Sequence, residues 1–129
     1  MNKEKFSVSK RLKSFVYAFN GLKVMFKEEH NARIHLFFTC IVLVFVLIFR
    51  FTLIEYGLLA LAVGLVFMAE LFNSAIENLC DHISSENHEK IKIIKDLSAA
   101  AVLVSAFTSF IIGCLVLLPK IIWFFKLMV

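Results

Sequence analysis

Three long runs of apolar residues constrain the fold of this chain more than any other feature. A helix rises about 1.5 Å per residue, so roughly 20 apolar residues cross a hydrocarbon core about 30 Å thick. The runs predict membrane-spanning helices at about 33–54, 57–83 and 97–118. We expect the third helix to stop at Pro119, because proline cannot continue a helix without losing a hydrogen bond.

The composition agrees with a membrane protein. Of the 129 residues, 60% are hydrophobic and 19% are charged, whereas soluble domains average about 45–50% apolar and about 25% charged residues. The net charge of +4 is better explained by membrane orientation than by nucleic-acid binding, because most of the basic excess precedes the first apolar run. We predict an all-α membrane protein, a single domain over residues 1–129 and no nucleic-acid partner.

The segment at about 8–30 predicts an amphipathic helix that lies in the membrane interface. Its apolar residues recur at spacings of four and three, the helical repeat. They are Val8, Leu12, Phe15, Phe19, Leu22 and Phe26. A soluble helix that packs on another surface is the open alternative.

Basic residues predict the orientation of the chain, because Lys and Arg set membrane topology and acidic residues contribute little. They are concentrated before the first span, and Lys90, Lys92 and Lys95 follow in the loop before the third. We therefore expect the N-terminus and this second loop to be cytoplasmic.

The second span carries a stripe of polar residues. At about 100° per residue, Glu77 and Asp81 each lie about 20° from Glu70 around the helix, and Asn73 lies about 60° away. Ionisable residues inside a span are functional by default, because they cost free energy unless they face protein or water. Three carboxylates on one wall would repel one another unless a cation joined them, and oxygen ligands alone favour Mg²⁺.

Further charged residues are expected at the same membrane face. Glu29 precedes the first span, and Lys95 with Asp96 opens the third. A metal, a lysine and a base are the groups that phosphoryl transfer requires. Alternatively, Glu29 is a solvated first-turn charge and the Lys95–Asp96 pair is an ordinary helix boundary. The four histidines, which include His35, are assigned no role.

Two segments resemble the prokaryotic diacylglycerol kinase family. They are AELFNSAIENLCDHISSENHEKIKIIKDLSAAAVL, residues 69–103, and YAFNGLKVMFKEEHNARIH, residues 17–35. The resemblance implies a multi-pass kinase of the bacterial plasma membrane, a homotrimer whose subunits share active sites at the cytoplasmic face. Such a kinase uses MgATP, with Mg²⁺ as cofactor, to phosphorylate a lipid hydroxyl.

The resemblance also implies roles for individual residues. Glu70 matches the catalytic base and Asn73 its neighbour in the active site, and Glu29 and Glu77 match the metal-binding carboxylates. The residues implied to bind the nucleotide are Lys10, Arg11, Tyr17, Glu29, Glu77, Asp81, Lys95 and Asp96.

The lipid acceptor stays open between undecaprenol and diacylglycerol. His35 stands where Gram-negative members carry an acid, and the sequences RIH at 33–35 and LPK at 118–120 are closer to the branch that resembles undecaprenol kinase, which favours undecaprenol slightly. A different class of function, a small proton- or cation-coupled transporter with Glu70 as carrier, is the alternative. It fits less well, because the polar residues of the spans lie only in their cytoplasmic halves.

Overall fold

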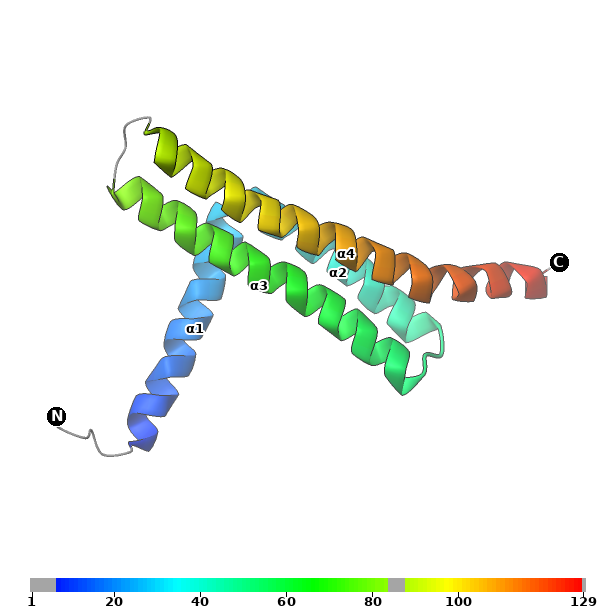
Figure 1. The fold of residues 1–129 in the computed structure, drawn as a ribbon. Coiled ribbons are helices and arrows are strands. Elements are labelled where there is room, and N and C mark those ends of the chain that lie inside the picture. The colour runs from blue at the N-terminus through cyan, green and yellow to red at the C-terminus, as the bar shows by residue number, and fades with distance from the viewer. Residues whose placement is uncertain (1–6, 84–87, 129) are drawn as a thin grey trace.

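The described part of the chain folds into four helices. The computed structural model describes residues 7–83 and 88–128, and every regular element in these ranges is helical. The helices are α1 (Val8–Glu28), α2 (His30–Ile48), α3 (Leu53–Ile83) and α4 (Glu89–Met128). Figure 1 shows α2, α3 and α4 grouped into a bundle, which α1 leaves at a steep angle.

The core lies between α3 and α4, which run side by side in opposite directions (Figure 1). Ser109 of α4 donates a hydrogen bond from Oγ to the carbonyl oxygen of Ala62 on α3 at 2.8 Å. Small side chains such as Ala62 and Ser105, both buried, let membrane helices approach closely. The α3–α4 pair therefore forms the rigid frame that positions the acidic stripe.

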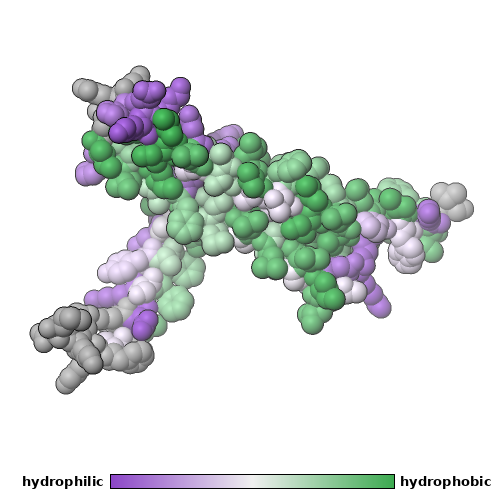
Figure 2. Space-filling model, in the orientation of Figure 1, coloured by the Kyte–Doolittle hydropathy of each residue, from purple (hydrophilic) through white to green (hydrophobic). Residues whose placement is uncertain are grey.

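Helix α2 packs much less tightly against this frame. Most of its large side chains, among them Phe37, Leu43 and Leu47, are exposed. Three helices, α2, α3 and α4, are long and apolar enough to cross a membrane. Apolar side chains cover the middle of the bundle and hydrophilic side chains gather toward its ends (Figure 2), so lipid or a further protein surface can cover the exposed faces.

Helix α1 contacts the bundle only near its C-terminal end. Met25 is buried, and the ring of Phe26 meets the edge of Phe67 on α3 at a centroid distance of 5.6 Å. Leu12, Phe15 and Phe19 of the expected apolar stripe are exposed. The structure thus supports a helix over this segment, and within the described residues half of its apolar stripe has no covering surface. Lys3 and Lys5 of the basic N-terminus lie outside the described residues.

The turn between α2 and α3 comes earlier and is longer than predicted. The predicted spans 33–54 and 57–83 leave only residues 55 and 56 between them, whereas α2 ends at Ile48 and α3 begins at Leu53. The Glu55 N–H donates to Oγ1 of Thr52 at 3.3 Å, and the Thr52 N–H donates to Oε2 of Glu55 at 2.6 Å. This reciprocal pair is a capping box, which satisfies two N–H groups at a helix start.

The prediction that the third helix stops at Pro119 is wrong, because α4 continues through this proline to Met128. Helix α4 also begins at Glu89, so Lys90, Lys92 and Lys95 lie on a helix and not in a loop. The bounds 97–118 for the membrane-crossing part of this helix stay a prediction. A proline removes one backbone hydrogen bond, and membrane helices tolerate this loss where local adjustment satisfies the freed group. Most residues after Pro119 are apolar, and in an apolar environment a helix is the structure that satisfies their backbone hydrogen bonds.

Candidate active site

The polar stripe of α3 runs from a buried end to an exposed end. Glu70 is 0% exposed and Asn73 is buried. Glu77, one turn further, is half-buried, and Asp81 is exposed. Burial along this face therefore decreases from Glu70 to Asp81.

Glu70 is a buried carboxylate without hydrogen bonds to the described residues. Both of its side-chain oxygens are buried without a hydrogen-bond partner. The nearest cationic or titratable neighbour is His35 of α2, whose Nε2 lies 3.3 Å from Oε1. A buried carboxylate that lacks compensation costs of order several kcal/mol. Such an arrangement is uncommon in a core and typical of a site that awaits a ligand or a proton.

Asn73 lies between Glu70 and Glu77 on the stripe and bonds to Glu77. Its Nδ2 donates to Oε1 of Glu77 at 2.9 Å, one turn along the helix. Its Oδ1 is buried and unpaired. Asn73 therefore holds the Glu77 carboxylate in place and leaves an oxygen ligand free beside it.

Glu29 joins this group from the junction between α1 and α2. The charges of Glu29 and Glu77 both act on Glu70 through space. Glu29 is half-buried, and its N–H donates to the Met25 carbonyl oxygen at 2.8 Å. This contact anchors the junction, so three carboxylates from two parts of the chain converge on one region.

Lys95 and Asp81 form an ion pair between α4 and α3. Asp81 is exposed and Lys95 is half-buried. The carbonyl oxygen of Lys95 accepts a hydrogen bond from Ser98 Oγ at 2.9 Å. This ion pair lies at the exposed end of the stripe. Through it Lys95, the lysine expected at the start of the third span, contacts the acidic face of α3.

The remaining expected nucleotide residues are not brought to this group by one chain. Tyr17 and Arg11 are exposed on α1, and along a straight helix Tyr17 lies about 18 Å from Glu29. The side chain of Lys10 lies outside the described residues. Asp96 is exposed beside Lys95.

The expected Mg²⁺ site requires oxygen ligands, and Glu29, Glu77 and Asn73 are the residues that could supply them. In residues 7–83 and 88–128 no group of three or more His, Cys, Asp or Glu side chains is arranged to hold a metal ion. Mg²⁺ commonly uses one or two carboxylates and completes its shell with waters and substrate phosphates. Glu29 and Glu77, with the unpaired Oδ1 of Asn73, are oxygen donors that fit this requirement.

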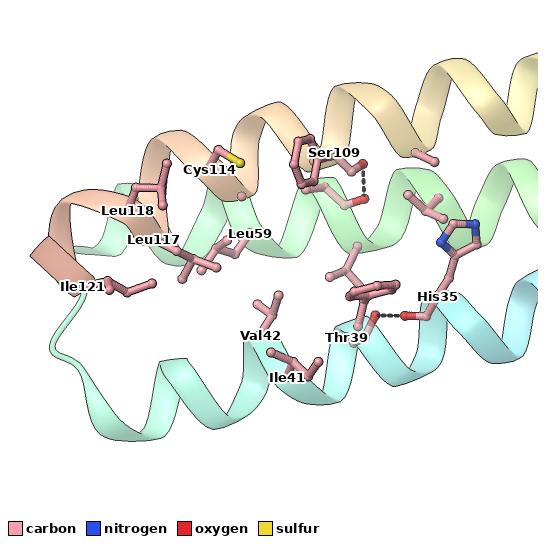
Figure 3. A pocket seen from close by; sticks show the side chains of 17 residues that line it. His35, Thr39, Ile41, Val42, Leu59, Ser109, Cys114, Leu117, Leu118 and Ile121 are labelled. Carbon is pink, nitrogen blue, oxygen red and sulfur yellow. Dashed lines mark hydrogen bonds between the residues drawn. The ribbon is translucent and has the colours of Figure 1, made fainter.

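An apolar cavity of about 450 Å³ lies between α2 and the α3–α4 pair. Figure 3 shows its lining, from Leu117 and Ile121 at one end to His35 at the other. Because His35 also contacts Glu70, the cavity and the acidic group share this residue. Sequence reasoning gave His35 no role; the only signal was a polar residue early in an apolar span, one position before Leu36.

These features define a class: a multi-pass membrane protein with acidic side chains among its helices, one of them fully buried. Residues 16–117 match the sequence pattern of the prokaryotic diacylglycerol kinase family. The chain is 38% identical over 109 residues to the undecaprenol kinase of Bacillus subtilis, covering 84% of this chain and 89% of that protein.

Two further relatives are diacylglycerol kinases. The protein of Synechocystis is 37% identical over 112 residues, which cover 86% of this chain and 64% of that protein. The protein of Haemophilus influenzae is 36% identical over 94 residues, which cover 73% and 80%. The chain therefore belongs to the prokaryotic diacylglycerol kinase family and is a lipid kinase.

Proposed function

We propose that this kinase transfers the γ-phosphate of MgATP to the hydroxyl of a membrane lipid at the cytoplasmic face. The observation that carries the proposal is Glu70, whose two carboxylate oxygens are fully buried and without hydrogen-bond partners. An unpaired carboxylate is a proton acceptor, and phosphoryl transfer to an alcohol needs a base for the hydroxyl proton.

In the proposed reaction, Glu70 accepts the proton of the lipid hydroxyl while the hydroxyl oxygen bonds to the γ-phosphorus. The bond between that phosphorus and its bridging oxygen breaks, and ADP leaves. Asn73 orients Glu77 through the hydrogen bond described above, and Lys95 contributes positive charge toward the phosphates. Most of the catalytic effect in such reactions comes from positioning and electrostatic stabilisation.

Mg²⁺ is the proposed cofactor, with Glu29 and Glu77 as its protein ligands. When bound, it would neutralise charge on the phosphates of ATP. The support is the donor chemistry and the convergence of these two charges on the region of Glu70.

Undecaprenol is the favoured acceptor and diacylglycerol the second candidate. The match to the B. subtilis undecaprenol kinase covers more of both chains than the match to the H. influenzae diacylglycerol kinase. The test is to reconstitute the purified protein with MgATP and to offer each lipid separately. Phosphorylation of undecaprenol at a higher kcat/KM supports the assignment, and a preference for diacylglycerol would reverse it. None of the relatives reported above is a transporter, so the transporter alternative gains no support.

We also propose a homotrimer with shared active sites and with α1 in the membrane interface. The supporting observation is geometric: in one chain Tyr17 and Arg11 lie far along α1 from the acidic group, while the flanks of α2 are uncovered. Mixing subunits that each lack a different active-site residue tests this proposal. Recovery of activity in the mixture supports shared sites, and a mixture that stays inactive argues for independent subunits.

The cytoplasmic orientation follows from the distribution of Lys and Arg. A cysteine introduced at Ser85, which lies outside the described residues, can be labelled after the three native cysteines are replaced. Labelling only from the cytoplasmic side is expected. Labelling only from outside the cell would invert the topology and rule out a cytoplasmic ATP site.

A further inference from the structure

We propose that His35 is a positioning residue for the lipid kinase reaction and holds the Glu70 carboxylate where the apolar cavity meets the acidic group. This inference rests on the proposed function, in which Glu70 is the base. No role was assigned to His35 from the sequence, and its position becomes informative only through the packing of α2 against α3.

The first observation is the distance between the two side chains. His35 Nε2 lies 3.3 Å from Oε1 of Glu70, close to hydrogen-bond length although the angle does not yet form the bond. An imidazole N–H donates to a carboxylate and so fixes its orientation. Catalytic hydrogen bonds are often long before substrate binds and shorten in the reacting complex.

The second observation is the lack of competing donors around Glu70 in the described residues. The Asn73 amide donates to Glu77, and the Lys95 ammonium is paired with Asp81. Glu29, at the junction between α1 and α2, and Glu77, on the same helix as Glu70, bring like charge. Among the described neighbours His35 is therefore the group whose chemistry suits Glu70.

The third observation is that the His35 side chain borders two environments. It lines the apolar cavity in Figure 3, and its Nε2 lies 3.3 Å from Oε1 of the fully buried Glu70. The side chain thus lies at the place that a lipid hydroxyl must reach if its hydrocarbon part stays among apolar side chains.

The test compares His35→Phe with His35→Gln in the full-length enzyme reconstituted in lipid bilayers. Phe keeps a ring of similar size but cannot donate a hydrogen bond, whereas Gln keeps an N–H donor. The same substitution at the exposed residue His88, His88→Phe, is the control. We measure kcat, KM for MgATP and the thermal unfolding midpoint of each variant.

We expect His35→Phe to lower kcat by roughly 10- to 100-fold, in line with the loss of one positioning hydrogen bond to a charged group, while KM for MgATP and the unfolding midpoint change little. His35→Gln should recover most of kcat, and His88→Phe should match the wild type. Equal losses in the Phe and Gln variants, or a normal kcat in His35→Phe, would overturn the proposal. If His35→Phe fails to fold, His35→Leu replaces it in the same comparison.

A double-mutant cycle separates this inference from the proposed function. In a Glu70→Gln background, His35→Phe should change kcat by less than about twofold, because residues that act as one unit are not additive. An equally large loss in both backgrounds would show that His35 acts independently of Glu70, against the proposal. Full activity in Glu70→Gln alone would instead remove Glu70 as the base, which is a failure of the proposed function.

Discussion

Two glutamates on the same helix, Glu55 and Glu70, have opposite surroundings. Glu55 accepts a hydrogen bond from the Thr52 N–H and one from Lys120 Nζ at 3.0 Å. Lys120 also lies 5.4 Å from the centre of the Phe51 ring. Glu70, deep in the bundle, has no hydrogen bond to either oxygen.

The difference distinguishes a carboxylate that stabilises the fold, Glu55, from the carboxylate that is the proposed base, Glu70. Glu55 caps the start of α3 and ties the α2–α3 turn to α4 just beyond Pro119. Its partners come from the chain itself. Buried polar groups are nearly always paired, yet neither oxygen of Glu70 has a hydrogen-bond partner among the described residues, and the imidazole of His35 lies 3.3 Å away. Variants of the two regions test the roles proposed for these two glutamates.

The largest effect is expected for Glu70→Gln. Gln has nearly the same volume but is not a base, so kcat should fall by about 10² to 10⁴ while MgATP still binds. Steady-state kinetics beside an ATP-binding measurement checks this prediction. Glu70→Asp, which is one methylene shorter, should recover only part of the rate. Loss of ATP binding in Glu70→Gln would move Glu70 into the nucleotide site.

Glu77→Gln should have the next largest effect, because it removes one proposed metal ligand without a change in volume. We expect the apparent affinity for MgATP to fall roughly 10- to 100-fold, the usual consequence of losing a bond to a charged group. A titration of activity against Mg²⁺ is the measurement, and Mn²⁺ should restore part of the rate. Unchanged Mg²⁺ dependence with normal turnover would contradict the metal role. Removal of divalent ions with a chelator should abolish activity in the wild type.

Lys95→Met should raise KM for MgATP more than it lowers kcat. The ammonium that pairs with Asp81 is the proposed cation for the phosphates, and Met keeps the unbranched aliphatic part of the side chain. A change of about tenfold in KM is expected for one charged contact. Because Asp81 is exposed, the unfolding midpoint should move little. A large loss of stability with normal KM would make this pair structural.

The smallest effect on activity is expected for Lys120→Met and Glu55→Gln. Both variants remove the ion pair at the end of the bundle that lies away from Asp81, and neither touches the acidic group. We expect kcat within about twofold of the wild type and a slightly lower unfolding midpoint, because both side chains still reach solvent, with Lys120 26% and Glu55 24% exposed, and ion pairs near the surface contribute little. A kcat loss similar to that of Glu70→Gln would erase the distinction between the two regions.

Much of the architecture could be predicted from local sequence. Bilayer thickness sets how long an apolar helix must be, so the three spans follow from the apolar runs and are present as α2, α3 and α4. The helical repeat places Glu70, Asn73 and Glu77 on one face without reference to any other helix. Their burial and hydrogen bonding agree with that placement.

Helix ends were harder to predict, because they depend on competition between local and surrounding effects. Pro119 is a strong local stop signal, yet α4 continues for nine residues beyond it. In a membrane, ending the helix would leave several backbone N–H and C=O groups without hydrogen bonds. Their loss costs more free energy than the one hydrogen bond that proline removes. The capping box of Thr52 and Glu55 could have been read from the sequence TLIE, since its spacing fits the known pattern.

The number of apolar segments long enough to span a membrane and the polar face of α3 can be read from the sequence alone, since segment length and angular position are properties of a single helix. Which residues of other helices meet that face depends on the tertiary structure. The contact of His35 with Glu70, the pairing of Lys95 with Asp81 and the bond from Ser109 to Ala62 all depend on how helices rotate and pack. That choice is made by side-chain fit between helices distant in sequence, which no local pattern encodes.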